Sequence, residues 1–103
     1  MPYLGEAVAV RASARHPFTE EVVPDLSGHV DFFAPGKSPQ RNPDDRTPDV
    51  SNIPVSFDEE IEAYVAYVLT DGSPWESGRW SYRVKLEGDN WKNWEYGNFL
   101  LRE

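Results

Sequence analysis

The amino-acid sequence predicts an all-β fold, an antiparallel β-sandwich, and the clearest observation is the segment from Arg79 to Leu86. Its large apolar side chains alternate with polar ones, as in a strand with one face on a core and the other in water. Nine prolines and seven glycines among 103 residues supply many turn signals and disfavour a long helix. The length suits a single domain, residues 1–103, with a modest core. The apolar positions of the segment are Trp80, Tyr82, Val84 and Leu86, and the polar positions are Arg79, Ser81, Arg83 and Lys85.

Composition and charge argue against several classes of protein. Hydrophobic residues make up 39% of the chain and aromatic residues 14%, which is too much for a disordered chain. The absence of cysteine excludes disulfides and cysteine-ligated metals, and it fits folding in a reducing compartment. The formal charge of −8 argues against general nucleic-acid binding, which needs cations to replace the counterions of the phosphates. The sequence shows no apolar run of membrane-spanning length and no secretory leader, so we expect no membrane partner.

Three further segments are expected to be strands. Glu6–Arg15 has period two, with Val8, Val10, Ala12 and Ala14 on one face, although a helix is an alternative for this alanine-rich run. His29–Ala34 is a second strand, closed by Pro35 and Gly36. Residues 87–90 predict a hairpin turn, followed by a last strand from Trp91 to Arg102 with a bulge at Gly97.

The segment Ser56–Asp71 is compatible with two structures. Its apolar residues recur at helical spacing, and Ser56 with Glu59 resembles a capping box. The run from Ala63 to Thr70 is rich in β-branched and aromatic residues, which favours a strand. We predict a strand, with apolar side chains on both faces, as in a central strand covered on both sides.

Residues 35–54 are expected to form one long proline-rich loop or arm. Five prolines punctuate this segment, and each removes a backbone donor and holds its predecessor extended. Loops of this length in compact domains are usually functional or disordered. The arm is therefore the first candidate for contact with a partner, through Arg41, Asp44, Asp45 and Arg46.

Four tryptophans lie close together in the C-terminal part of the chain. Trp80 is on the apolar face of its strand, where one large aromatic residue often anchors the core of a small immunoglobulin-like sandwich. Trp91 and Trp94 have odd spacing and cannot share a strand face, so one of them is expected to be exposed. Trp75, in a turn, is a further exposed candidate, and exposed tryptophan is enriched at binding hot spots. We therefore add Trp75, Trp91 and Trp94 to the candidate partner-binding residues.

The sequence gives little indication of catalysis, of a metal site or of a cofactor. The two histidines, His16 and His29, stand in no recognisable nucleophile motif. The acidic run Asp58–Glu60 has neither the alternation nor the glycine of a calcium loop, and it is expected to be a solvated surface. The polar residues Arg79, Arg83 and Lys85 form a positive stripe on an acidic chain, which is a second candidate partner surface.

Three segments resemble a group of small immunoglobulin-like virion proteins of tailed bacteriophages. They are Leu4–Val10, Tyr64–Leu69 and Gly78–Arg83, the last with the glycine-x-tryptophan-x-tyrosine pattern that recurs in that group. The resemblance implies a non-enzymatic structural protein of the virion, assembled in the host cytoplasm. It would be a capsid decoration protein that binds the major capsid protein or another virion protein, with self-association on the particle, or a tail component. The alternatives are a carbohydrate- or receptor-binding module that uses exposed tryptophans, and an acidic inhibitor of a basic partner.

Overall fold

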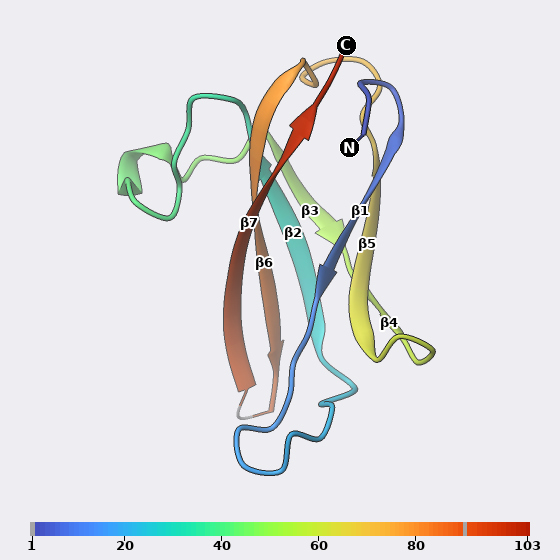
Figure 1. The fold of residues 1–103 in the computed structure, drawn as a ribbon. Helices are drawn as coiled ribbons and strands as arrows, with labels where there is room; N and C mark the ends of the chain where they lie inside the picture. Colours follow the sequence, from blue (N-terminus) through green and yellow to red (C-terminus); the bar gives the residue numbers. More distant parts are fainter. Residues whose placement is uncertain (1, 90) are drawn as a thin grey trace.

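The computed structural model describes residues 2–89 and 91–103, and it is a sandwich of two antiparallel sheets (Figure 1). The first sheet has the strand order β1-β5-β4 and the second has the order β3-β2-β6-β7. The predicted all-β fold is therefore confirmed, and no helix in the described part of the chain is long and apolar enough to cross a membrane. The strands are β1 (Ala7–Ala12), β2 (Ser27–Phe33), β3 (Val50–Pro54), β4 (Ser56–Asp58), β5 (Ala63–Leu69), β6 (Gly78–Gly88) and β7 (Trp91–Leu101), with one 3-10 turn, η1 (Pro43–Asp45).

The strand orders fit an immunoglobulin-like arrangement. In such domains strands B, E and D belong to one sheet and strands C′, C, F and G belong to the other. Lettering β1 to β7 as B, C, C′, D, E, F and G reproduces both orders. On this lettering β2 and β6 are the central strands of the larger sheet, and β7 is one of its edges.

The core lies between the two sheets, and its chemistry follows the predicted alternation. Val8, Val10 and Ala12 of β1 are buried, as the period-two pattern predicted, and their small size lets the sheets approach closely. Trp80 of β6 is fully buried, and its indole N–H donates to the carbonyl oxygen of Glu76 at 2.9 Å. This bond satisfies the one polar atom that its burial takes from water.

A tyrosine from β5 fastens the connection between β1 and β2. The hydroxyl of Tyr64 donates to the carbonyl oxygen of Val23 at 2.6 Å and accepts from the amide of Leu26 at 3.2 Å. Because Tyr64 is buried, both bonds form away from competing water. The irregular segment that links the two sheets is thereby held against the core.

The segment Ser56–Asp71 contains two strands joined by a turn. β4 and β5 pair antiparallel around residues 59–62, where Glu62 has a positive φ of 53°. The prediction of a strand is correct for β5, but the expectation of cover on both sides is wrong. Tyr64 faces the core, whereas Tyr67 and Leu69 are 70% and 59% exposed on the other face.

The predicted proline-rich loop ends earlier than expected, because residues 50–54 form the edge strand β3. Val50 and Ile53 pack against the core, and Pro54 pairs with His29 at the end of the ladder. A proline is tolerated there because an edge strand needs donors on one side only. The structure also begins β2 at Ser27, two residues before the predicted start.

The hairpin between β6 and β7 is longer and more regular than predicted. Residues 87 and 88 belong to β6, the predicted turn at Asn90 lies outside the described residues, and the pairing runs without a register shift to Leu101. No bulge occurs at Gly97 within this ladder, so that prediction is wrong. Gly97 is instead the place where the Tyr82 ring crosses the opposite strand, and a Cβ there would overlap the ring.

The edge strand β7 carries a carboxylate on its inner side. Glu95 pairs with the buried Val84, and it accepts a hydrogen bond from the backbone amide of Ser13. Burial raises the pKa of Glu95 above its usual 4.5, and this outweighs the lowering effect of the Ser13 bond. Burial, and then the charge of Glu95, raise the pKa of Tyr82 above its usual 10.0.

Substitution of Gly97 by alanine should destabilise the fold through the Tyr82 ring. We expect Gly97→Ala to lower the free energy of unfolding by about 1–3 kcal/mol, because the ring must leave its position over the strand. The loss should be much smaller in a Tyr82→Ala background, where the obstructing ring is absent. Urea denaturation of the four proteins of this cycle measures both effects, with Lys92→Ala as an exposed control on the same strand. Equal losses in both backgrounds would contradict the assignment.

Candidate interaction surface on the four-stranded sheet

The proline-rich arm, residues 35–49, is folded and fastened to the end of β2. The carboxylate of Asp49 accepts a hydrogen bond from the amide of Ala34 at 2.7 Å and an ion pair from Lys37 at 3.0 Å. The ammonium group of Lys37 also donates to the carbonyl oxygen of Thr47 at 3.0 Å. These bonds join the two ends of the arm where it leaves and re-enters the sheet.

The tip of the arm is held by its own polar side chains. Asn42 caps η1 by accepting from the amide of Asp44, and Asp45 accepts from the amide of Ser38 at 3.0 Å. The guanidinium of Arg46 donates to the carbonyl oxygen of Pro39 at 2.8 Å. Of the four arm residues predicted to bind a partner, Asp45 and Arg46 therefore have structural roles inside the arm. Arg41 and Asp44 are exposed.

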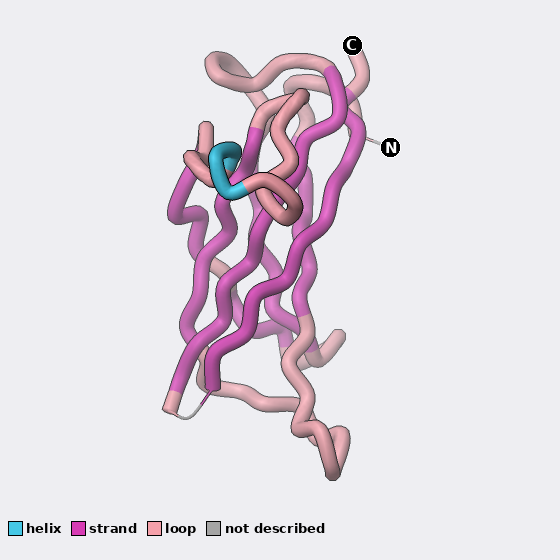
Figure 2. Tube along the Cα trace, turned by 90° about the vertical axis from the view of Figure 1, so that its left-hand side faces the viewer, coloured by secondary structure: helices cyan, strands magenta, loops and turns pink. Residues whose placement is uncertain are grey.

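The arm stands on the outer face of the four-stranded sheet, which Figure 2 shows from that side. The outer residues of this sheet alternate with the core residues, so they are known from the register. On β2 they include Asp31 and Phe33, and Phe33 is fully buried although it lies outside the central core. Phe33 marks the point where the chain leaves the sheet for the arm.

Asp31 is a buried carboxylate that joins three strands on this outer face. It is 4% exposed and accepts from Arg83 of β6 at 2.8 Å and from the amide of Asn52 of β3 at 3.0 Å. The Nε2 atom of His29 lies 3.5 Å from the same carboxylate. A buried charge needs such partners, since an unpaired one costs several kcal/mol.

Arg83 continues this network to the edge strand β7. Its guanidinium carbon lies 5.4 Å from the ring centre of Phe33 and 5.0 Å from that of Trp94. The ammonium group of Lys85 lies 5.3 Å from the same Trp94 ring. Both contacts are within the range of cation–π attraction, so two cations hold the Trp94 ring in place while it stays 41% exposed.

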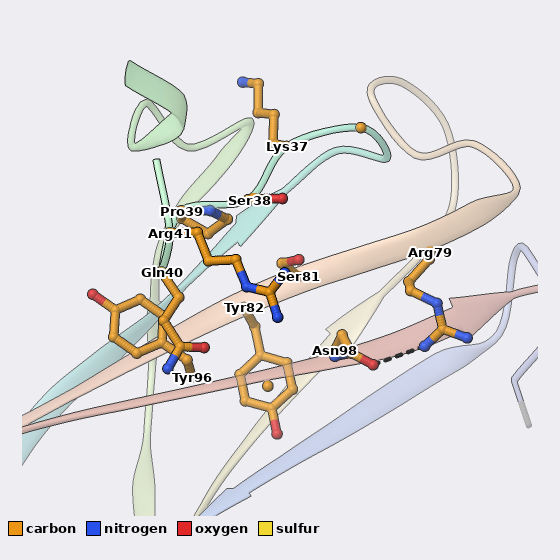
Figure 3. A pocket seen from close by; sticks show the side chains of 12 residues that line it. Lys37, Ser38, Pro39, Gln40, Arg41, Arg79, Ser81, Tyr82, Tyr96 and Asn98 are labelled. Atoms are coloured by element: carbon orange, nitrogen blue, oxygen red, sulfur yellow. Dashed lines mark hydrogen bonds between the residues drawn. The ribbon is translucent and has the colours of Figure 1, made fainter. Parts of the chain in front are cut away.

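A hollow of about 440 Å³ opens between the arm and strands β6 and β7 (Figure 3). Arg41 reaches across it from the arm, and Arg79 closes its other side with a 2.8 Å bond to Asn98. Tyr96 supplies an aromatic wall, and Ser81 and Asn98 supply polar groups. The hollow is therefore lined by two guanidinium groups and by the side chains of two tyrosines, Tyr82 and Tyr96.

The arm and the outer face together are weakly basic, although the chain is acidic. They carry seven of the ten lysine and arginine residues against five carboxylates, those of Asp31, Asp44, Asp45, Asp49 and Glu87, and a surface with an excess of cations attracts acidic groups. We call this surface, with Trp94 and Tyr96, the arm-and-sheet face. Its basic residues are Lys37, Arg41, Arg46, Arg79, Arg83, Lys85 and Lys92.

The three tryptophans predicted to bind a partner have different environments. Trp75 is half-buried and packs against Trp80 and Phe32 at ring-centre distances of 4.4 and 5.3 Å, so its predicted exposure is wrong. Trp91 is half-buried against the core, and Trp94 is the exposed member of the pair with odd spacing. The structure thus brings Arg41 and Trp94 to one face, whereas Trp75 and Trp91 pack against the core.

Sequence reasoning missed Asp31 and Tyr96 as parts of this surface. Asp31 was visible as a polar residue in an apolar strand, the usual sign of a buried charge with a partner. The alternation of β6 did indicate the cationic stripe of Arg79, Arg83 and Lys85. Among the described residues, no group of three or more histidine, aspartate or glutamate side chains is placed to hold a metal ion.

Comparison with known proteins gives no relative for this chain. No protein-family model matches it, and neither a curated protein nor a solved structure matches it.

Loss of the Asp49 carboxylate charge should release the arm. We expect Asp49→Asn to increase the rate of trypsin cleavage after Lys37, Arg41 and Arg46, because both the ion pair and the anchoring of Ala34 weaken. Mass spectrometry of the fragments measures the rates. The matched control is Asp44→Asn, on the same arm, and it should leave the rates unchanged. Equal rates in all three proteins would contradict this role of Asp49.

The same anchor should depend on acidity. Burial opposes ionisation of Asp49, but the hydrogen bond from Ala34 and the bond and charge of Lys37 outweigh it and lower its pKa below the usual 3.8. Its contribution to stability is therefore complete above pH 3.8 and is lost as the pH falls through the lower pKa of the folded state. We expect hydrogen-exchange protection of the Ala34 amide, followed by NMR, to weaken in that acidic range and not above it.

The Asp31–Arg83 pair gives a prediction about stability. We expect Asp31→Ala to lower the free energy of unfolding by about 3 kcal/mol, because it leaves a largely buried guanidinium without its carboxylate. The double variant Asp31→Ala with Arg83→Met should recover most of that loss, since no buried charge then remains. Urea denaturation checks both values. A single-variant loss below about 1 kcal/mol would show that the pair is dispensable.

Proposed function

We propose that this chain is a non-enzymatic structural protein of a tailed-phage virion, and that it decorates the assembled head. In this proposal the arm-and-sheet face docks on an acidic surface of the major capsid protein. The resemblance of three segments to small virion proteins supports the class of protein. The observation that carries the docking surface is a rigid, basic and aromatic face on a chain whose net charge is −8.

The segment that carries the resemblance has a physical role in this fold. Gly78 adopts a φ of 132°, and a Cβ there would meet the ring of Pro35, where the arm begins. Trp80 fills the core, and Tyr82 crosses Gly97. The glycine-x-tryptophan-x-tyrosine pattern thus seats β6 between the core and the arm, which supports its use as a marker of this kind of domain.

The arm-and-sheet face has the properties of a protein-binding surface. Arginine, tryptophan and tyrosine dominate binding hot spots, and here Arg41, Arg79, Trp94 and Tyr96 lie on one face. The bonds of Asp49 and Asp45 hold the arm before a partner arrives, so little conformational entropy is lost on docking. A tail protein with an acidic surface would suit the same face.

A carbohydrate-binding module is the second candidate, and Trp94 is the observation in its favour. Trp94 and Tyr96 occupy alternate positions of β7 and therefore share its outer face, with Asn98 next along. An aromatic ring beside amide and hydroxyl groups can stack on a sugar and bind its hydroxyl groups. The head-decoration proposal is preferred because Arg83 and Lys85 lie against Trp94, and Arg41 and Arg79 line the hollow beside Tyr96. Binding of a neutral sugar does not require these cations.

Co-sedimentation with phage heads tests the proposed function. The probe is a preparation of heads from the phage that encodes this chain, produced after the gene for this chain has been deleted from the phage genome. We expect the purified protein to sediment with the heads, and binding to weaken as salt is added, because the contacts are ionic. The variant Arg41→Ala with Arg79→Ala should lose about tenfold or more in affinity, as hot-spot residues do.

The control is Arg15→Ala, which removes an exposed cation outside the arm-and-sheet face and should bind the heads like the unchanged protein. The virion proposal would be overturned if the unchanged protein sedimented neither with the heads nor with particles that also contain tails. Retention on a glycan array that is abolished by Trp94→Ala and insensitive to salt would favour the carbohydrate module instead.

A further inference from the structure

The outer face of the three-stranded sheet carries apolar side chains, and the part around Tyr67 and Leu69 is open to solvent, whereas Val65 is buried. On β5 this face carries Val65, Tyr67 and Leu69, and the register places Ala7 and Ala9 of β1 beside the last two. Tyr67 and Leu69 are the exposed large apolar residues of the strand, at 70% and 59%. The small alanines leave the Tyr67 ring standing above its neighbours. An apolar sheet face of this kind is typical of a surface that binds another protein.

A hollow lies directly beside the projecting tyrosine. It has a volume of about 730 Å³ and lies along β4 and the turn that follows it. Its apolar lining comes from Pro54, Phe57 and Val65, and its acidic rim from Asp58, Glu59 and Glu60. The face therefore presents a ring that projects and, next to it, a recess with partly apolar walls.

We propose that a second copy of this chain covers the three-stranded face, related by a two-fold axis parallel to β5. β1 and β4 flank β5 on opposite sides, since Arg11 and Ser56 are both opposite Val65. Rotation about that axis sets β1 of each copy over β4 of the other. Because this rotation keeps each residue at its own level along β5, the Tyr67 rings of the two copies meet at the axis, and the contact is self-complementary, as a two-fold interface must be.

The charges on the two flanks favour this pairing. Arg11 lies on the β1 side of the face, and the acidic rim of Glu59 and Glu60 lies on the β4 side. In the two-fold arrangement Arg11 of each copy lies at the level of Ser56 of the second copy, two residues before Asp58, and its long side chain extends toward the acidic rim. This gives two attractive contacts in place of like-charge repulsion. This complementarity identifies a second copy as the occupant. The proposal is independent of head binding, which uses the opposite sheet.

The size of the face sets the strength of the association. Strands about 4.8 Å apart with about 3.3 Å per residue give a three-stranded face of roughly 14 by 23 Å. That is smaller than the ~800 Å² per partner of a standard interface, so the dimer is weak and depends on concentration. Many copies held close together on a lattice would favour it.

Sedimentation velocity of the full chain tests the dimer, between about 1 μM and about 1 mM, the range expected for a small interface. We expect the unchanged protein to pass from monomer to dimer over this range. Tyr67→Lys should raise the dissociation constant about tenfold or more, because two like charges then meet at the axis in place of two rings. Phe18→Ala, which removes another highly exposed aromatic residue, should have no effect. A monomer throughout the range would overturn the proposal, and so would an assembly larger than a dimer.

Exchange of charges tests the geometry of the interface. Arg11→Glu alone, and Glu59→Lys with Glu60→Lys alone, should each be monomeric because like charges then face each other twice. An equimolar mixture of the two should dimerise, since both contacts are again between opposite charges in the mixed dimer. Circular dichroism confirms that each variant is folded. Failure of the mixture to dimerise, with both variants folded, would exclude the two-fold arrangement.

Discussion

Asp31 is the residue through which the strands of the larger sheet are linked on their outer face. Its carboxylate binds Arg83 of β6 and the backbone of β3, and Arg83 then lies against Trp94 of β7. The hydrophobic effect alone would leave this face open to water, because the core is on the other side. The buried ion pair fixes the relative positions of the cations and aromatic rings, and so it determines the shape of the arm-and-sheet face.

The arm depends on the same end of the sheet. Asp49 binds Ala34, the residue that directly follows β2, so the arm is anchored where the buried part of that strand ends. A segment rich in proline has few backbone donors of its own, and side chains must supply the bonds that hold it. Lys37, Asp45 and Arg46 do so, which explains why a chain segment without a core of its own has one conformation.

Parts of the fold could be predicted because they depend on local alternation. β6 and the inner face of β1 follow the period of two, and the buried Trp80 follows from it. The division of Ser56–Asp71 into two strands could not be predicted, since a turn with a positive φ at Glu62 has no glycine to mark it. β3 was not predicted, because the proline at its end, Pro54, is a residue typical of loops.

The candidate site was predictable only in part. The cations of β6 could be found from their alternation, and an exposed tryptophan in the Trp91–Trp94 pair followed from the odd spacing. The proximity of Arg41 to Arg79 could not be predicted, because it depends on how far the arm folds back over the sheet. Side-chain bonds between residues that are distant in the sequence determine that fold.

A different consequence follows from Glu95, the inward carboxylate of the edge strand. Inward charges keep edge strands from joining those of other molecules. Because burial raises the pKa of Glu95, this carboxylate loses its charge at a higher pH than an exposed glutamate does, and net repulsion between molecules weakens as the protein approaches its isoelectric point of 4.6. Acidification therefore weakens two protections of the long edge of β7 together, the inward charge on the strand and the net charge of the molecule.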